Sequence, residues 1–316
     1  MTGGRTDLII GDQHARAIDR LAARRVRSGV RVPCLNAFVD TRTPGSDAKE
    51  NFSIIGSGVA ENPAQHVHIT EPHGFNIGGA RQPPGCTNSQ HSHDTAEVFV
   101  VHSGRWRFDF GEHGDDAQLF AGPGDVVSFP IHAFRGFRNV GEETGFLWSI
   151  LGGDDPGRVT WAPRVFELAA NYGLVLLKNG ALVDVGAGDS MPIGAAPMPV
   201  TDRAAIALLR VMRPSDEAEV LARAWAMAPS GETLVIGAGG MLPPTKGFTL
   251  TRLSLAAGTV REGQCEVLFV QEGTIDVRTD DGTLEIACGD TLTVPAGIKA
   301  TYASSNGATL FAVRRI

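Results

Sequence analysis

The sequence has few cysteines, no long apolar run and no excess of basic residues, and each absence excludes a class of protein. The four cysteines among 316 residues have none of the spacings of zinc or thiol redox sites, so we expect reduced thiols in a cytoplasmic protein. No apolar run is long enough to span a bilayer, and the first ten residues lack the apolar core of a secretory signal. The net charge of −7 provides no basic surface for nucleic acid or for an anionic membrane.

Glycine and proline, by contrast, are abundant, with 39 and 18 residues. This composition favours many short strands joined by tight turns. Residues 105–110 (RWRFDF) alternate strictly, so Trp106 and Phe108 are expected on the same face of a strand. Further β-like runs occur at 98–101 and 126–129. We therefore predict an all-β protein.

Four parts follow one another along the chain. Residues 1–50 are expected to form an N-terminal arm with a short helix within 14–29, and residues 51–153 a first β domain. Residues 154–230 have helical periodicity on both sides of a glycine-rich stretch, which predicts a partly helical connector. The β-like pattern returns in residues 231–316, which predicts a second β domain.

The two β regions repeat each other. The pattern of residues 97–104 recurs 169 residues later at 266–273, and that of 124–130 recurs 165 residues later at 289–295. The difference of four residues falls in a hairpin that is longer in the first copy. A constant register that changes only at a turn predicts a duplicated domain.

One motif carries the chemistry. His91, His93 and Glu97 are separated by even numbers of residues, so on an extended chain the three side chains leave the same face. Two imidazoles and a carboxylate suit a divalent first-row metal and leave coordination positions open. The same pattern could also consist of surface polar residues near a strand. Glycines precede and follow the three residues, at Gly85 and Gly104, and a second motif runs from Gly124 through Pro130 to Asn139.

These two motifs resemble the two signatures of the cupin superfamily over about residues 80–141. The resemblance implies two fused jelly-roll barrels, with metal ligands His91, His93 and Glu97 in the first. At the corresponding positions of the second copy, Val260 and Glu262 replace the histidines and only Glu266 is kept. We therefore expect the second barrel to serve stability, assembly or the shape of the first site.

The sequence departs from the cupin pattern at Arg135, where a further histidine ligand is expected. Arginine stays protonated and cannot bind a metal. Arg135 is therefore predicted to hold an anionic group of the substrate as a catalytic residue, or to form a structural ion pair. Alternatively, His132 could turn inward as a replacement ligand. Phe99, Trp106 and Phe137 are the candidate walls of the substrate pocket.

Two-barrel cupins with one working site resemble the gentisate- and salicylate-type ring-cleaving dioxygenases and the quercetinase group. The resemblance implies a non-haem Fe(II) dioxygenase that acts on an aromatic or enolic anion. The alternatives are a Mn-, Zn-, Ni- or Fe-dependent isomerase or lyase acting on a keto or hydroxy acid, and a non-catalytic ligand-binding protein. The expected partners are a small substrate and further copies of the chain in a homo-oligomer.

Overall fold

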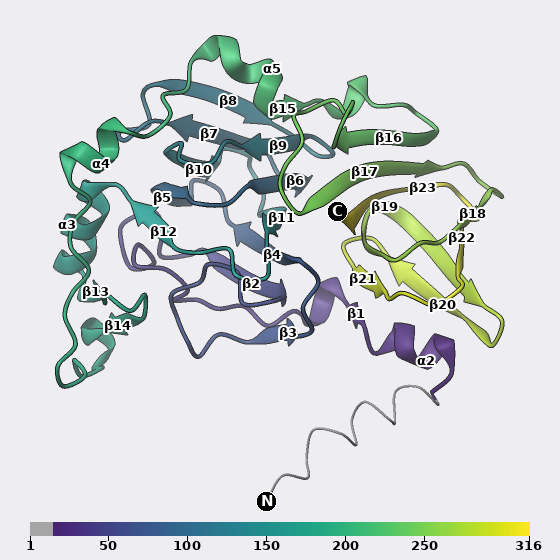
Figure 1. The fold of residues 1–316 in the computed structure, drawn as a ribbon, viewed down its shortest axis with the longest axis horizontal. Helices are drawn as coiled ribbons and strands as arrows, with labels where there is room; N and C mark the ends of the chain where they lie inside the picture. Colours follow the sequence, from purple (N-terminus) through teal and green to yellow (C-terminus); the bar gives the residue numbers. More distant parts are fainter. Residues whose placement is uncertain (1–14) are drawn as a thin grey trace, which may run out of the picture. The chain divides into compact units, whose positions relative to one another are not determined.

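The computed structural model describes residues 15–316, which consist mainly of β-strands (Figure 1). Two compact units are present. The N-terminal unit comprises Val32–Ala226, Ile236–Phe248 and Ile316, and the C-terminal unit comprises the described residues up to Arg31, Met227–Val235 and Thr249–Arg315. Within residues 15–316, no helix is long and apolar enough to cross a membrane.

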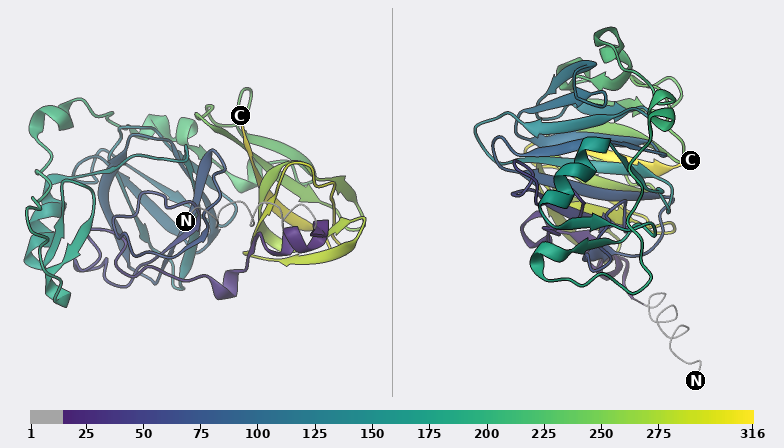
Figure 2. Two further views of the ribbon diagram at one scale, coloured as in Figure 1. Left: turned by 60° about the horizontal axis from the view of Figure 1, so that its bottom comes forward. Right: turned by 90° about the vertical axis from the view of Figure 1, so that its left-hand side faces the viewer.

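Two sheets close around the interior of the N-terminal unit (Figure 2). In each sheet every neighbouring pair is antiparallel, except for the parallel pair of β2 (Glu50–Ile55) and β3 (Val67–Ile69). The seven-stranded sheet has the order β15 (Leu221–Ala222), β9 (Val126–Phe129), β6 (Glu97–Ser103), β11 (Gly145–Gly152), β4 (Phe75–Gln82), β2 (Glu50–Ile55) and β3 (Val67–Ile69). The five-stranded sheet has the order β12 (Val159–Trp161), β5 (Thr87–His93), β10 (Arg135–Asn139), β7 (Trp106–Phe110) and β8 (Ala117–Ala121).

Alternation along β7 supplies much of the apolar core of this unit. Trp106, Phe108 and Phe110 are buried, whereas the intervening Arg107 and Asp109 are partly exposed. The three aromatic side chains join a cluster with residues of β6, β8, β9 and β11. The strand and its period of two, predicted for residues 105–110, are confirmed.

Residues 154–230, which the sequence suggests are a connector, contribute to both sheets of the N-terminal unit. β12 pairs with β5, and β15 pairs with β9. The remaining elements of this segment are the helices α3 (Pro163–Asn171), α4 (Arg203–Ala207) and α5 (Glu217–Val220), the strands β13 (Leu174–Leu176) and β14 (Leu182–Asp184), and the 3-10 turns η2 (Val185–Ala187), η3 (Pro214–Asp216) and η4 (Ala224–Ala226).

The C-terminal unit is a second β structure in which the long strand β19 (Glu266–Thr279) pairs with four others. Its main sheet has the order β1 (Arg25–Val26), β21 (Thr291–Val294), β19 (Glu266–Thr279), β23 (Ala308–Arg315), β17 (Phe248–Leu255) and β16 (Gly231–Ile236). β18 (Val260–Glu262), β20 (Gly282–Ala287) and β22 (Thr301–Ala303) complete this sheet, and the 3-10 turn η1 (Ser28–Val30) follows β1 in the chain.

The short helix expected within residues 14–29 covers only part of that range. In the described part of the chain, α2 covers only Ala17–Ala22 and packs Ile18 and Leu21 into the core of the C-terminal unit. The chain then leaves the helix because residues 25–26, as β1, pair with β21. Local periodicity predicts an amphipathic helix but not a strand partner about 265 residues away.

Equivalent positions of the predicted repeat occupy equivalent places in the two units. Glu97 begins β6 and Glu266 begins β19. Gly104 and Gly273 both have positive φ, 86° and 79°, and a side chain at either position would meet backbone atoms of a neighbouring strand or turn. The duplication inferred from the spacing therefore has a counterpart in backbone conformation.

Candidate metal centre

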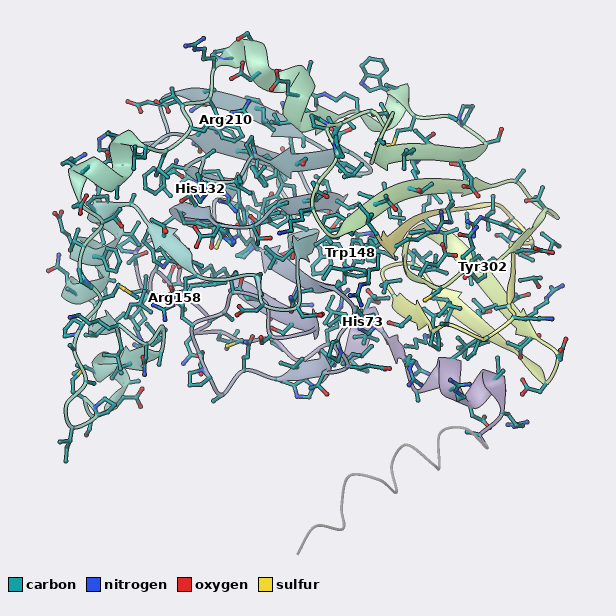
Figure 3. All side chains as sticks on the ribbon, in the orientation of Figure 1. His73, His132, Trp148, Arg158, Arg210 and Tyr302 are labelled. Atoms are coloured by element: carbon teal, nitrogen blue, oxygen red, sulfur yellow. The ribbon has the colours of Figure 1, made fainter. Side chains whose placement is uncertain are left out.

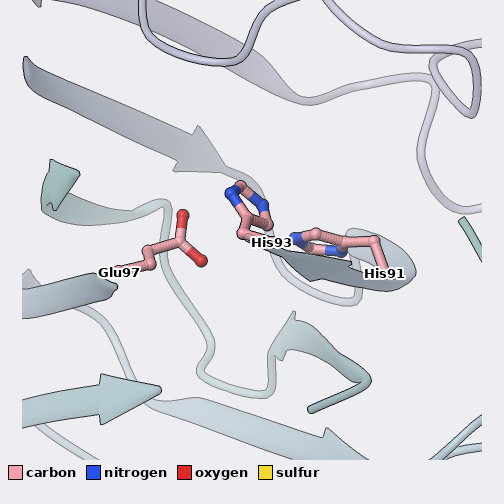
Figure 4. Close-up of side chains that lie close together, drawn as sticks. All are labelled: His91, His93 and Glu97. Carbon is pink, nitrogen blue, oxygen red and sulfur yellow. The ribbon is translucent and has the colours of Figure 1, made fainter. Parts of the chain in front are cut away.

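Three side chains predicted as metal ligands lie together inside the N-terminal unit (Figure 4). One potential ligand atom from each of His91, His93 and Glu97 falls within 4.8 Å of the others. The histidines come from β5 and the glutamate is the first residue of β6, and all three residues are buried. The surface-polar interpretation of this motif is therefore wrong.

A β-bulge in β5 sets the direction of these side chains. On β10, Arg135 lies opposite His91 and Phe137 lies opposite Asn88, so Ser89 and Gln90 together face Gly136. Asn88 and His91 consequently point to the same interior, although their odd separation would place them on opposite faces of a regular strand. The bulge thus adds Asn88 to the face that carries the two histidines.

The surroundings of both imidazoles favour the neutral form that a metal ligand needs. The Nδ1 atom of His91 lies 2.7 Å from the carbonyl oxygen of Ser89, to which it donates, so Nε2 of the neutral ring keeps its lone pair. Nδ1 of His93 is buried and has no hydrogen-bond partner. Burial, reinforced by the nearby positive charge of Arg135, lowers the pKa of both histidines well below the usual value.

Arg135 forms a buried ion pair with Glu97. Its Nη2 donates to Oε2 of Glu97 at 2.6 Å, and the side chain is 1% exposed. Its guanidinium lies over the ring of Phe129, 5.3 Å from the centroid. Burial lowers the pKa of Arg135, an effect that the charge of Glu97 opposes. Of the two readings from sequence, the geometry matches the structural ion pair, because this guanidinium contacts Glu97 and not the cavity described below.

His132 does not join the cluster. Its φ of 59° is the only positive value among the described non-glycine residues, and its side chain is 50% exposed. Nδ1 of His132 lies 3.6 Å from a carboxylate oxygen of Asp94. Its carbonyl accepts a hydrogen bond of 2.8 Å from the backbone N–H of Arg210, which Figure 3 shows nearby. The expectation that His132 replaces the missing ligand is therefore not met in this structure.

The three ligand candidates line a cavity with about 660 Å³ of empty space, part of it open to solvent. Phe99 and Phe137 are among its walls, as the sequence suggested. Trp106 is not, because the alternation of β7 directs it into the apolar core, where its Nε1 donates to the carbonyl of Ser103. The other lining residues relevant to the chemistry are Phe38, Phe52, Trp161, Asn51, Ser53, Gln65, Asn88 and Ser149.

Sequence reasoning identified none of these further wall residues, of which Trp161 and Asn88 matter most for the site. Trp161, from β12 in the supposed connector, packs its ring 5.2 Å from that of His91 and donates from Nε1 to Oε1 of Glu61 at 2.6 Å. Asn88 is 7% exposed, and its Oδ1 accepts from the buried Lys49 at 2.8 Å. No local pattern marks Trp161, whereas Asn88 could have been suspected from its closeness to the His-x-His pair.

The donor set fits a divalent metal ion. Two neutral imidazoles and one carboxylate form a three-ligand set of the kind that binds first-row metals and leaves positions open. The unpartnered Nδ1 of His93 supports this fit, since a buried polar atom without a partner is costly unless something binds it. Oε1 of Glu97 has no hydrogen bond to Arg135, which contacts only Oε2. The residues present could therefore hold one metal ion.

Comparison with known proteins finds similarity to cupins over part of the sequence and in the fold. The cupin domain model (Cupin_2) matches residues 80–150. A germin-like protein of Arabidopsis thaliana (subfamily 1 member 7) is 31% identical over 134 residues, or 37% of this chain; the match spans 58% of that relative's length.

Two solved structures are similar over 92% of the chain. One is the bacterial pirin YhhW of Escherichia coli in complex with nickel(II), with a TM-score of 0.53, 10% identity and 96% of that chain covered. The other is oxalate decarboxylase of Bacillus subtilis, with a TM-score of 0.55, 12% identity and 76% covered. At such identities the likeness concerns the fold, and it confirms the predicted pair of jelly-roll barrels.

Proposed function

We propose that this chain, which has the fold of a two-barrel cupin, is a metal-dependent enzyme and, more specifically, a non-haem Fe(II) dioxygenase. The observation that carries the proposal is the buried set of His91, His93 and Glu97 on the wall of a cavity. A storage or scaffold protein would not need three converging ligands on the wall of a cavity. Nickel, manganese or zinc could occupy the same ligands, and the similar pirin structure contains nickel(II).

The lack of further ionisable groups on the cavity wall favours redox chemistry over proton transfer. Among the described residues that line it, only His91, His93 and Glu97 carry titratable side chains; the remaining polar ones are asparagine, glutamine, serine and tryptophan. An isomerase or lyase needs a side chain that accepts and returns a proton. If the three titratable groups bind metal, none remains for that task.

Charge balance favours an anionic substrate. A divalent ion with Glu97 carries a net charge of +1, and the buried Arg135 adds a further positive charge beside Glu97. An enolate, phenolate or carboxylate that binds the open positions would offset this charge. Because neither lysine nor arginine is found among the cavity-lining residues, the metal itself would be the main cationic partner of the substrate.

The walls suit a flat substrate. Phe38, Phe52, Phe137 and Trp161 provide aromatic faces, which stack well against planar rings. The amide nitrogen of Asn88 forms no hydrogen bond within residues 15–316, because Lys49 occupies only Oδ1. A donor held in this orientation would bind a substrate oxygen next to the ligands. We therefore propose an aromatic or enolic substrate whose adjacent oxygens face His91, His93 and Asn88.

The chemistry that a bound iron supplies in such a site is electron transfer between the substrate and dioxygen. The chain's own residues fix the geometry: Arg135 orients Glu97, and the carbonyl of Ser89 orients His91. Because all three ligand residues are buried, electrostatic interactions among them are stronger than in water.

Metal analysis combined with oxygen uptake tests this proposal. Purified protein is compared with the variant His91→Ala, His93→Ala, and both are incubated with hydroxybenzoates, catechols and flavonols. Iron near one per chain, absent from the variant, together with oxygen consumption on one of these compounds, supports the dioxygenase. Bound metal with turnover of a keto or hydroxy acid but no oxygen uptake would support the isomerase or lyase instead. Failure to bind any divalent metal after reconstitution would leave a non-catalytic binding protein.

A further inference from the structure

A fully buried ion pair lies behind the candidate metal centre and takes no direct part in it. Lys49 precedes β2, Asp40 lies nine residues before it, and both side chains are 0% exposed. Nζ of Lys49 donates to Oδ1 of Asp40 and, at 2.8 Å, to Oδ1 of Asn88. Burying two charges is costly, and similar stability can be reached with apolar residues, so a pair in this place calls for a reason other than stability.

The second oxygen of Asp40 supports the β-bulge that orients His91. Oδ2 of Asp40 accepts from the backbone N–H of Ser89 at 3.0 Å. Ser89 is one of the two bulged residues, and a bulge removes backbone groups from the regular ladder. The carbonyl of the same residue accepts from Nδ1 of His91. Asp40 thus fixes the residue whose carbonyl selects the tautomer of His91.

Lys49 in turn fixes the amide of Asn88. An ammonium group can only donate, so the atom of Asn88 that faces Lys49 must be the oxygen, and the amide nitrogen is left for the cavity. Without Lys49, the amide could rotate and present an acceptor to the cavity. The orientation of the proposed substrate donor therefore depends on a residue that does not line the cavity.

We infer that the buried Asp40–Lys49 pair is a positioning device that holds His91 in its metal-binding tautomer and directs the amide of Asn88 into the cavity. This inference rests on the proposed function only for the purpose of the positioning, because the hydrogen bonds themselves join residues of the chain.

Two double variants separate the two links. Asp40→Leu with Lys49→Met removes both charges, the acceptor for Ser89 and the donor for Asn88. Asp40→Asn with Lys49→Met also removes both charges, but it keeps an acceptor for Ser89 and loses only the donor for Asn88. The matched control is Arg25→Met with Asp290→Leu in the C-terminal unit, where Asp290 likewise accepts from a cation and from a backbone N–H, that of Ser28.

The first measurement needs no metal. Nitrogen NMR of the histidine side chains, with His91 assigned from the spectrum of His91→Ala, should show an Nδ1-protonated ring in the wild type and the control. A mixture of tautomers is expected in Asp40→Leu, Lys49→Met. Affinity for Ni²⁺, measured by competition with a chromophoric chelator, should fall 10- to 100-fold in that variant, as is usual when support of a ligand is lost. A folded variant with the wild-type tautomer or wild-type Ni²⁺ affinity would overturn the inference.

The second measurement addresses Asn88 and remains available if the leucine variant does not fold. In Ni²⁺-loaded Asp40→Asn, Lys49→Met, catechol affinity is expected to drop about tenfold, corresponding to one oriented hydrogen bond, with Ni²⁺ affinity nearly unchanged. Unchanged catechol affinity would refute the role assigned to Lys49. If the wild-type protein binds no Ni²⁺ but the tautomer shifts as described, the proposed function fails and the positioning of His91 stands.

Discussion

Replacing Arg135 with methionine tests the electrostatic description of the centre. Arg135 and Glu97 are 2.6 Å apart, with side chains 1% and 8% exposed, so Arg135→Met would leave the carboxylate buried without its partner. Removing one member of a buried pair costs about 3–5 kcal/mol. For a folding unit of about 200 residues, where 1 kcal/mol corresponds to about 2–4 °C, the midpoint of thermal unfolding should fall by about 6–20 °C.

The metal should reverse part of this loss. In the variant, a divalent ion supplies the positive charge that Glu97 lacks, so saturating Ni²⁺ should raise the unfolding temperature more than in the wild type. Circular dichroism melts with and without Ni²⁺ measure both quantities. Arg138→Met, on the same strand but with a partly exposed side chain, serves as the control and should shift the midpoint only slightly. An Arg135→Met protein as stable as the wild type without metal would refute the reasoning.

Three further variants test the ligands, a buried acid and the cavity wall. His91→Ala with His93→Ala should reduce bound metal from about one per chain to none in elemental analysis. Burial raises the pKa of Glu61 from 4.5 to about 8, so the folded state retains a proton that the unfolded chain has released. The free energy of unfolding should therefore fall as pH rises from 4.5 to 8, by at most about 5 kcal/mol. Urea titrations at several pH values should show a flatter pH dependence for Glu61→Gln. A variant whose pH dependence runs parallel to that of the wild type would contradict the raised pKa of Glu61. Asn88→Asp keeps an acceptor for Lys49 but loses the donor, so catechol affinity of the Ni²⁺ form should drop at least tenfold. The control is Gln65→Glu, which should cause a smaller change because the amide nitrogen of Gln65 already donates to the carbonyl of Ser57.

The ligands could be found from the sequence because their geometry is local. His91 and His93 are two residues apart on one strand, and Glu97 opens the next strand four residues later, so the period of two and a short turn suffice to bring them together. The duplication could be predicted for the same reason, because the two copies of a motif keep the same spacing between their matching residues. The absence of the ligands from the second copy also followed directly from the repeat.

Contacts between distant segments could not be predicted in this way. Arg135 and Glu97 are 38 positions apart, Trp161 and Glu61 are 100 apart, and Asp40 reaches Ser89 across 49. Trp106 lies in the apolar core and not on the cavity wall, because alternation identifies an inward face but not the depth along the barrel. The bulge at residues 89–90 likewise has no glycine or proline to reveal it.

Comparison of Glu97 with Glu266 suggests what separates a metal centre from a structural cluster in this fold. Glu266 is also buried, but it accepts from Arg261, Arg314 and the hydroxyl of Tyr302, so that both of its oxygens are occupied. In the first copy a single arginine, Arg135, binds one oxygen of Glu97. A ligand atom of each of two histidines lies within 4.8 Å of a carboxylate oxygen of this glutamate. A carboxylate paired with arginine is thus common to both barrels, and the capacity for metal depends on the two imidazoles and on the oxygen that Arg135 leaves unoccupied. On this argument, adding histidines at positions 260 and 262 alone would not create a second metal site, because the carboxylate there has no oxygen to spare.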